Sequence, residues 1–171
     1  MKNSTKSPQK SDEKTKSGYS IIKGSSETEE DNCYLLQFDG LSEPNPGEST
    51  GGAVVFSPND RKPLFERGEY MGFGTNNQAE YTGLLIGIQS AIDMGIKEIL
   101  IEGDSNLVIN QVKGSWKVNN DKLKVINIQI RNLIENFTFV GIKHVYREKN
   151  VYADRITNDV VKTKKSYSKQ L

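Results

Sequence analysis

Apolar and polar side chains alternate along residues 33–38, which is the period of a half-buried β-strand, and the run ends at Asp39. The same pattern returns at residues 51–56 and at about 64–71, after short polar turns. Such short connections allow only antiparallel hairpins. The chain therefore predicts a meander of three antiparallel strands, which residues 72–74 (Gly-Phe-Gly) then interrupt.

A helical period follows the meander. Apolar residues recur every three or four positions from about residue 78 to 94, and Gly95 is placed to end that helix. The apolar run at residues 98–102 comes directly afterwards, so we expect a strand parallel to the first one through a right-handed crossover. The remaining expected elements are a short helix at 105–112, a helix from 120 or 121 to about 135, a strand at 137–146 and a last helix around 153–160.

This order predicts an α/β fold: a mixed five-stranded sheet, three antiparallel strands followed by two parallel additions, with helices on both faces. Residues 32–162 form the domain. Residues 1–31 are rich in Lys, Ser, Thr and Glu and have few large apolar groups, so we expect a disordered, low-complexity tail. Residues 163–171 are interpreted as a basic C-terminal tail that frays.

Composition narrows the function classes only a little. The net charge of +1 over 171 residues means that any basic surface for nucleic acid must be local. A single cysteine, Cys33, excludes an internal disulfide and a cysteine-based zinc cluster. There is neither a signal-peptide pattern nor an apolar run of about 20 residues. We expect an intracellular monomer, cytoplasmic or nuclear, that makes no contact with a membrane.

Four acids, Asp39, Glu80, Asp104 and Asp154, lie at the edges of predicted elements. Asp39 and Asp104 follow strands that should be neighbours, so they should lie side by side. Acids gathered in one place repel one another unless a cation is present, and ligation by oxygen alone selects magnesium or manganese. Each acid has an ordinary alternative: Asp104 could cap a helix, and Glu80 suits a helix dipole. Spacing alone therefore indicates only a possible metal site.

The residues around these acids add a family resemblance. The chain closely resembles type 1 ribonuclease H over about residues 34–161, with the acids in the order Asp, Glu, Asp, Asp. The matching segments are Asp39-Gly40, Asn45-Pro46-Gly47 and residues 75–80, 103–105 and 147–154.

The resemblance implies a ribonuclease H-like fold and an endonuclease that cuts the RNA strand of RNA/DNA hybrids with two magnesium ions, leaving 3′-hydroxyl and 5′-phosphate ends. Manganese is a possible substitute. Asp39, Glu80, Asp104 and Asp154 would be both the catalytic residues and the metal ligands. The residues that match minor-groove contacts of the family are Asn45, Asn76, Asn77 and Asn106. An amide both donates and accepts, which suits a 2′-hydroxyl, although loop or cap chemistry would also explain these asparagines.

The chain also departs from parts of the family. Residues 114–119 stand where some members have a basic helical protrusion. Trp116 and Lys117 could stack on and neutralise the DNA strand, or Trp116 could simply pack. Other members carry a histidine in a flexible loop before the last acid, whereas the one histidine here, His144, falls within a predicted strand and is interpreted as structural.

Two other functions compete with the nuclease. A hybrid-binding module of the same fold that has lost catalysis is the main alternative, and the presence of all four acids argues against it. An exonuclease on a related fold would need a second acid two residues after the first, where this chain has Leu41.

Overall fold

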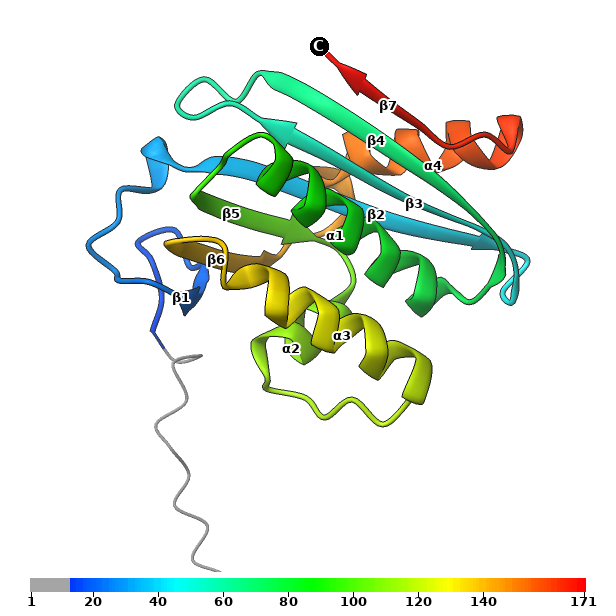
Figure 1. Cartoon of the computed structure of the whole chain (residues 1–171), viewed down its shortest axis with the longest axis horizontal. Coiled ribbons are helices and arrows are strands. Elements are labelled where there is room, and N and C mark those ends of the chain that lie inside the picture. The colour runs from blue at the N-terminus through cyan, green and yellow to red at the C-terminus, as the bar shows by residue number, and fades with distance from the viewer. Residues whose placement is uncertain (1–12) are drawn as a thin grey trace, which may run out of the picture.

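The computed structural model describes residues 13–171 and consists of one mixed sheet with helices on both faces (Figure 1). The strands are β1 (Ser20–Lys23), β2 (Tyr34–Glu43), β3 (Gly47–Phe56), β4 (Pro63–Gly74), β5 (Glu98–Gly103), β6 (Phe139–His144) and β7 (Tyr167–Gln170). The α-helices are α1 (Asn76–Asp93), α2 (Asn106–Lys113), α3 (Asp121–Ile134) and α4 (Val151–Thr163).

The order of strands across the sheet is β1-β6-β5-β2-β3-β4-β7. Strands β2, β3 and β4 pair antiparallel, while β5 is parallel to β2 and β6 is parallel to β5. Neighbouring residues of β3 point to opposite faces, where Gly51 lies under α1 and Gly52 lies under α4. The predicted α/β fold, with its antiparallel meander, parallel additions and helices on both faces, is confirmed.

The predicted count of five strands is wrong, because the sheet has seven. Both extra strands lie in the segments expected to be tails: β1 pairs antiparallel with β6, and β7 pairs antiparallel with β4. Each has only four residues, too few for a recognisable alternation, and each covers unpaired backbone groups at an edge of the sheet. Residues 1–12 of the expected N-terminal tail lie outside the described residues.

Two predicted strand ends also differ. Strand β2 does not end at Asp39 but continues to Glu43, paired with β3 throughout. Residues 72–74 do not interrupt the sheet, because β4 runs through them to Gly74. The register between β3 and β4 shifts at this point, and Gly72 takes the positive φ of 73° that a bulge favours. Glycines that resembled strand breakers are therefore parts of one long hairpin.

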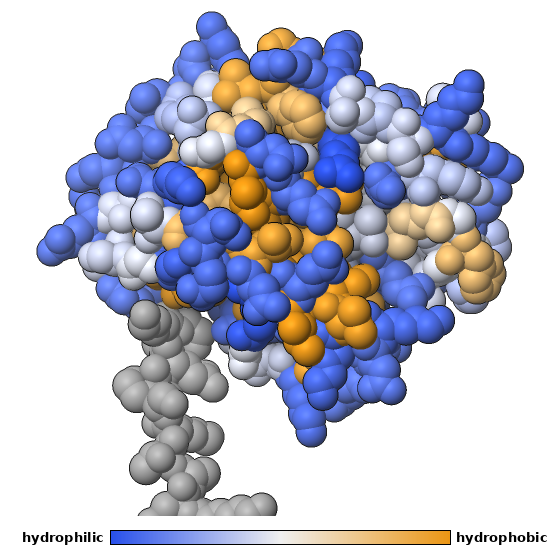
Figure 2. Space-filling model, in the orientation of Figure 1, coloured by the Kyte–Doolittle hydropathy of each residue, from blue (hydrophilic) through white to orange (hydrophobic). Residues whose placement is uncertain are grey.

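The main core lies between the sheet and helices α1, α2 and α3, and a smaller cluster of Val54, Ile156 and Val160 lies under α4. Helix α1 begins with a capping box, in which the Thr75 hydroxyl accepts from the Gln78 N–H and the Gln78 side chain accepts from the Thr75 N–H. On the helical face, hydrophobic residues reach the surface among hydrophilic ones (Figure 2). None of the helices in residues 13–171 is long and apolar enough to cross a membrane.

Candidate active site

Helix α1 lies unusually close to β2, and two glycines allow it. A Cβ atom added at Gly40 would lie 2.1 Å from the backbone nitrogen of Glu80, and one added at Gly83 would lie 2.2 Å from the carbonyl oxygen of Asp39. No side chain fits at either position. This contact places the first turns of α1 directly over the middle of β2, so that Glu80 faces Asp39.

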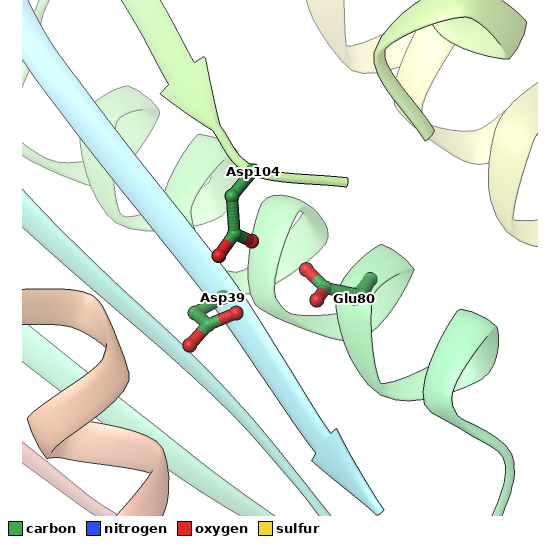
Figure 3. A group of neighbouring side chains, drawn as sticks. All are labelled: Asp39, Glu80 and Asp104. Atoms are coloured by element: carbon green, nitrogen blue, oxygen red, sulfur yellow. The ribbon is translucent and has the colours of Figure 1, made fainter. Parts of the chain in front are cut away.

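Three of the predicted acids meet at this contact. One carboxylate oxygen from each of Asp39, Glu80 and Asp104 lies within 4.8 Å of the other two (Figure 3). Strand β5 ends opposite Phe38 of β2, so Asp104 follows β5 beside the next residue of β2, which is Asp39. The three side chains thus come from a strand, a helix and a strand end far apart in the sequence. We refer to them as the acid group.

Asp154 lies in the first turn of α4 and is not a member of the acid group. It is nevertheless near enough that its charge contributes to raising the pKa of Asp39. Its Oδ1 atom is 3.9 Å from Nη2 of Arg147, whose side chain is 81% exposed. The structure therefore brings three of the four predicted acids into one tight group and leaves the fourth at its margin.

The electrostatics of the acid group favour a bound cation. Burial, and after it the charge of Asp104, raises the pKa of Asp39 to about 8. Burial and the charges of Asp39 and Asp104 raise the pKa of Glu80 well above its ordinary value. The Oε2 atom of Glu80 is buried and has no hydrogen-bond partner. A buried carboxylate oxygen without a partner, in a cluster of oxygen ligands only, fits a hard divalent cation.

The chain immediately before α4 is tied to the strand that carries Asp39. The Nδ2 atom of Asn150 is buried and donates to the carbonyl oxygen of Phe38 over 2.8 Å. The Nε2 atom of Gln37 donates to the carbonyl oxygen of Lys149 over 3.1 Å. Asn150 belongs to the segment that resembles the family, yet sequence analysis assigned it no role, since an asparagine in a polar loop usually indicates only a turn.

A cavity of ≈ 480 Å³ lies beside the start of α1. Its lining residues are Asn45, Pro46, Thr75, Asn76, Asn77, Asn120 and Leu123, and we call it the amide cavity. The Oδ1 atom of Asn45 accepts from the Asn76 N–H, and the Oδ1 atom of Asn76 accepts from the Ser42 N–H, both over 3.0 Å. The structure therefore brings together three asparagines that were predicted separately.

Comparison with known proteins shows what this arrangement resembles. The model of a family described as "Reverse transcriptase-like" matches residues 37–160. The ribonuclease HI of Halobacterium salinarum is 38% identical over 124 residues, which are 72% of this chain and 62% of that protein. The crystal structure of RNase H1 from the same organism has a TM-score of 0.73 and 36% identity, covering 76% of this chain and 98% of that one. The chain belongs to the type 1 ribonuclease H family.

Two further relatives of this ribonuclease H family member extend the comparison. The bifunctional protein Rv2228c of Mycobacterium tuberculosis is 37% identical over 127 residues, and the chain spans only 35% of its length. The structure of LC11-RNase H1 in complex with an RNA/DNA hybrid has a TM-score of 0.72 and 27% identity, covering 77% of this chain and 98% of that one.

The other predicted contacts of the ribonuclease H domain lie away from the amide cavity. Asn106 is exposed at the start of α2, where its Oδ1 atom accepts from Asn110. Trp116 is 46% exposed and Lys117 is also exposed, both in the loop after α2. Gln111 donates to the carbonyl oxygen of Lys117, which anchors that loop. Thr75 and Asn120 also line the cavity, and neither was predicted to contact the hybrid, since helix caps and ligand contacts use the same residue types.

His144 and Ser105 both make contacts beside Asp104 that explain their positions. The Nε2 atom of His144 is 3.1 Å from the carbonyl oxygen of Asp104, and the ring is half-buried. This contact supports the structural interpretation of His144. The hydroxyl of Ser105 accepts from the Val108 N–H and so caps α2, which leaves the Asp104 carboxylate available to the acid group.

Proposed function

We propose that this chain is an endonuclease that hydrolyses the RNA strand of RNA/DNA hybrids, leaving 3′-hydroxyl and 5′-phosphate ends. The observation that carries the proposal is the buried, unpartnered Oε2 atom of Glu80 beside Asp39 and Asp104. Buried carboxyl groups without partners cost folding free energy, and a purely structural role would not explain why three carboxyl groups lie together. Family membership makes ribonuclease H chemistry the natural use of them.

The acid group would hold two magnesium ions, with manganese as a substitute, and Asp154 would complete the ligand set from α4. When bound, such a pair supplies the positive charge that activates the attacking water and stabilises the leaving oxygen. The part of the protein is to hold the acids in place. Asp39 is carried within a paired strand and Glu80 on a helix that Gly40 and Gly83 hold against that strand, so neither acid depends on a flexible loop.

The amide cavity would recognise the hybrid. Because the Oδ1 atoms of Asn45 and Asn76 already accept backbone N–H groups, each residue offers a ligand its NH₂ group, which is a donor. Donors suit the acceptors of a minor groove and the 2′-hydroxyl that distinguishes RNA from DNA. A related structure, that of LC11-RNase H1, was solved with an RNA/DNA hybrid. Asn77 and Asn106 would extend this contact along the RNA strand, with Trp116 and Lys117 on the DNA strand.

The test compares four duplexes of one sequence: an RNA/DNA hybrid, duplex DNA, duplex RNA, and duplex DNA with internal runs of ribonucleotides of increasing length. Each is incubated with magnesium, with manganese and with a chelator. We expect metal-dependent cleavage of the hybrid and of runs above a minimum length, and no cleavage of duplex DNA. Tight hybrid binding without turnover in either metal would instead indicate a binding module, and equal cleavage of duplex DNA would exclude hybrid specificity.

A further inference from the structure

A second buried carboxylate, that of Glu66 on β4, lies on the α4 face of the sheet and is separate from the acid group. Its side chain is 7% exposed. The hydrophobic cluster on this face includes Val54, Ile156 and Val160. A carboxylate among such neighbours is retained only if its oxygens are hydrogen-bonded or paired with a cation.

Glu66 finds its partners on two other elements. Its Oε2 atom accepts from the Tyr152 hydroxyl over 2.7 Å and from Nη2 of Arg155 over 3.3 Å, both on α4. Its Oε1 atom accepts from the Tyr167 hydroxyl of β7 over 3.3 Å. Figure 1 shows β7 along the β4 edge of the sheet and α4 behind β3 and β4. One side chain therefore joins the last helix and the C-terminal strand to β4.

These contacts have a direct consequence for Asp154, which lies between Tyr152 and Arg155 on α4. Asp154 stands outside the acid group, so its distance from Asp39 depends on where the first turn of α4 sits. The only ion pair of its carboxylate within residues 13–171 is the 3.9 Å pair with the exposed Arg147, which is a weak restraint. The helix must therefore be held by other contacts.

The anchors of α4 divide between its two sides. On the side of β2 and β3, Asn150 donates to Phe38, and the Thr50 hydroxyl donates to the carbonyl oxygen of Thr157 over 3.0 Å. Toward β4, the hydrogen bonds of α4 side chains to the sheet all go to Glu66 within residues 13–171. Loss of the Glu66 contacts would leave the β4 side of the helix held by the hydrophobic cluster alone.

We propose that Glu66 is a positioning residue of the active site, which through Tyr152 and Arg155 fixes the first turn of α4 and thereby the place of Asp154 beside the acid group. The Tyr167 hydroxyl makes the C-terminal strand part of this support. The inference rests on the proposed function, because it assumes that Asp154 helps to hold metal. It assigns the C-terminal strand a role in the site although β7 carries none of the four acids.

The test uses four variants. Glu66→Ala removes every contact. Glu66→Gln keeps the volume and can still accept from Tyr152 while donating to Tyr167. Tyr152→Phe removes one hydroxyl, and Tyr70→Phe is the matched control, since its hydroxyl on the same strand bonds to Glu48 over 3.3 Å and not to α4. Two quantities are measured at a temperature where every variant is folded: the magnesium dependence of hybrid cleavage, and the calorimetric affinity for magnesium alone.

We expect Glu66→Ala to raise the half-saturating magnesium concentration by about tenfold, the lower end of the range for groups that orient metal ligands, with little change in KM for the hybrid. Tyr152→Phe should act in the same direction but less, while Glu66→Gln and Tyr70→Phe should match wild type. A lowered melting temperature with an unchanged magnesium dependence would overturn the proposal and leave Glu66 as structural support only.

Each way for the experiment to fail has a distinct meaning. If Glu66→Ala does not fold, Tyr152→Phe decides, and an unchanged magnesium affinity in that variant overturns the proposal. If wild type cleaves no hybrid, the proposed function fails. The calorimetric comparison then still judges the positioning role, because it measures the affinity for magnesium without any turnover.

Discussion

The acid group and the amide cavity both adjoin the start of α1, yet they are built in opposite ways. In the acid group, Asp39 and Glu80 are buried with raised pKa values, and one oxygen of Glu80 has no partner. In the amide cavity, the side-chain oxygens of Asn45 and Asn76 each accept a backbone N–H, and Thr75 forms a capping box.

This difference separates a site that is incomplete from one that is already satisfied. The acid group destabilises the metal-free fold, because its charges repel one another and the buried Oε2 atom of Glu80 has no hydrogen-bond partner. The amide cavity stabilises the fold, because its hydrogen bonds join the end of the β2–β3 hairpin to the first turn of α1. Substitutions in the acid group should therefore raise the stability of the metal-free protein and lower its activity. Substitutions in the amide cavity should lower both stability and activity.

The largest effect is expected from Asp39→Asn. This change removes a charge from the acid group while keeping its shape, so the rate of hybrid cleavage at saturating magnesium should fall by more than about a hundredfold. In a chelator at pH 8 the same variant should melt at a higher temperature than wild type, because the repulsion is reduced. Asp93→Asn, at the exposed end of α1, is the control and should change neither quantity. Wild-type activity in Asp39→Asn would refute the metal site.

The second effect concerns pH. The pKa of Asp39 is raised from 3.8 to about 8, so the folded protein binds this proton more tightly than the unfolded chain does. The resulting stability is complete below pH 3.8 and is lost as the pH rises toward 8. The melting temperature of the metal-free protein should therefore decrease as the pH is raised from 5 to 8, by about 2–4 °C for each kcal/mol of folding free energy lost.

Magnesium should flatten this pH dependence, since a bound cation favours the ionised acids. In Asn76→Ala, the melting temperature of the metal-free protein should depend on pH as it does in wild type, because this change alters the amide cavity and not the acid group. A metal-free protein whose melting temperature rises from pH 5 to 8 would contradict the repulsion that distinguishes the two regions.

A smaller effect is expected from Asn76→Ala itself. The Ser42 N–H loses its acceptor, which should cost about 1–3 kcal/mol of folding free energy. The KM for the hybrid should rise while the half-saturating magnesium concentration stays unchanged, as measured by steady-state kinetics. Asn132→Ala, on the exposed surface of α3, controls for the loss of an asparagine. A shifted magnesium dependence would show that the two regions are not independent.

The smallest effect is expected from Lys117→Ala. Lys117 is exposed, and in the proposed function it neutralises a phosphate of the DNA strand. Its removal should therefore reduce the slope of log affinity against log salt by about 1 without changing kcat. Lys97→Ala is the control, because Lys97 precedes β5 whereas the acid group lies beyond the other end of that strand. Equal salt slopes in Lys117→Ala and wild type would remove Lys117 from the proposed DNA contact.

Much of the fold could be predicted because it rests on local patterns. The alternation in β2 and β3, the apolar stripe of α1 and the position of Gly95 are written in neighbouring residues. The short edge strands could not be predicted, because β1 and β7 exist only where β6 and β4 offer unpaired backbone groups. Asp39 was expected at a strand end because the apolar alternation stops there, whereas β2 continues to Glu43 and only its parallel neighbour β5 ends beside it.

The candidate site divides in the same way. The four acids could be identified from residue types and their order in the sequence. No local pattern shows that Gly40 and Gly83 allow α1 to pack against β2, or that Asp154 lies outside the group of the other three acids. Sequence by itself determined the elements and the chemistry available to them, because hydrophobic period and side-chain type are local properties. Only the tertiary structure decided which oxygens meet, which lack a partner and which helix must be held in place, since distances, burial and mutual repulsion exist only once distant segments have packed together.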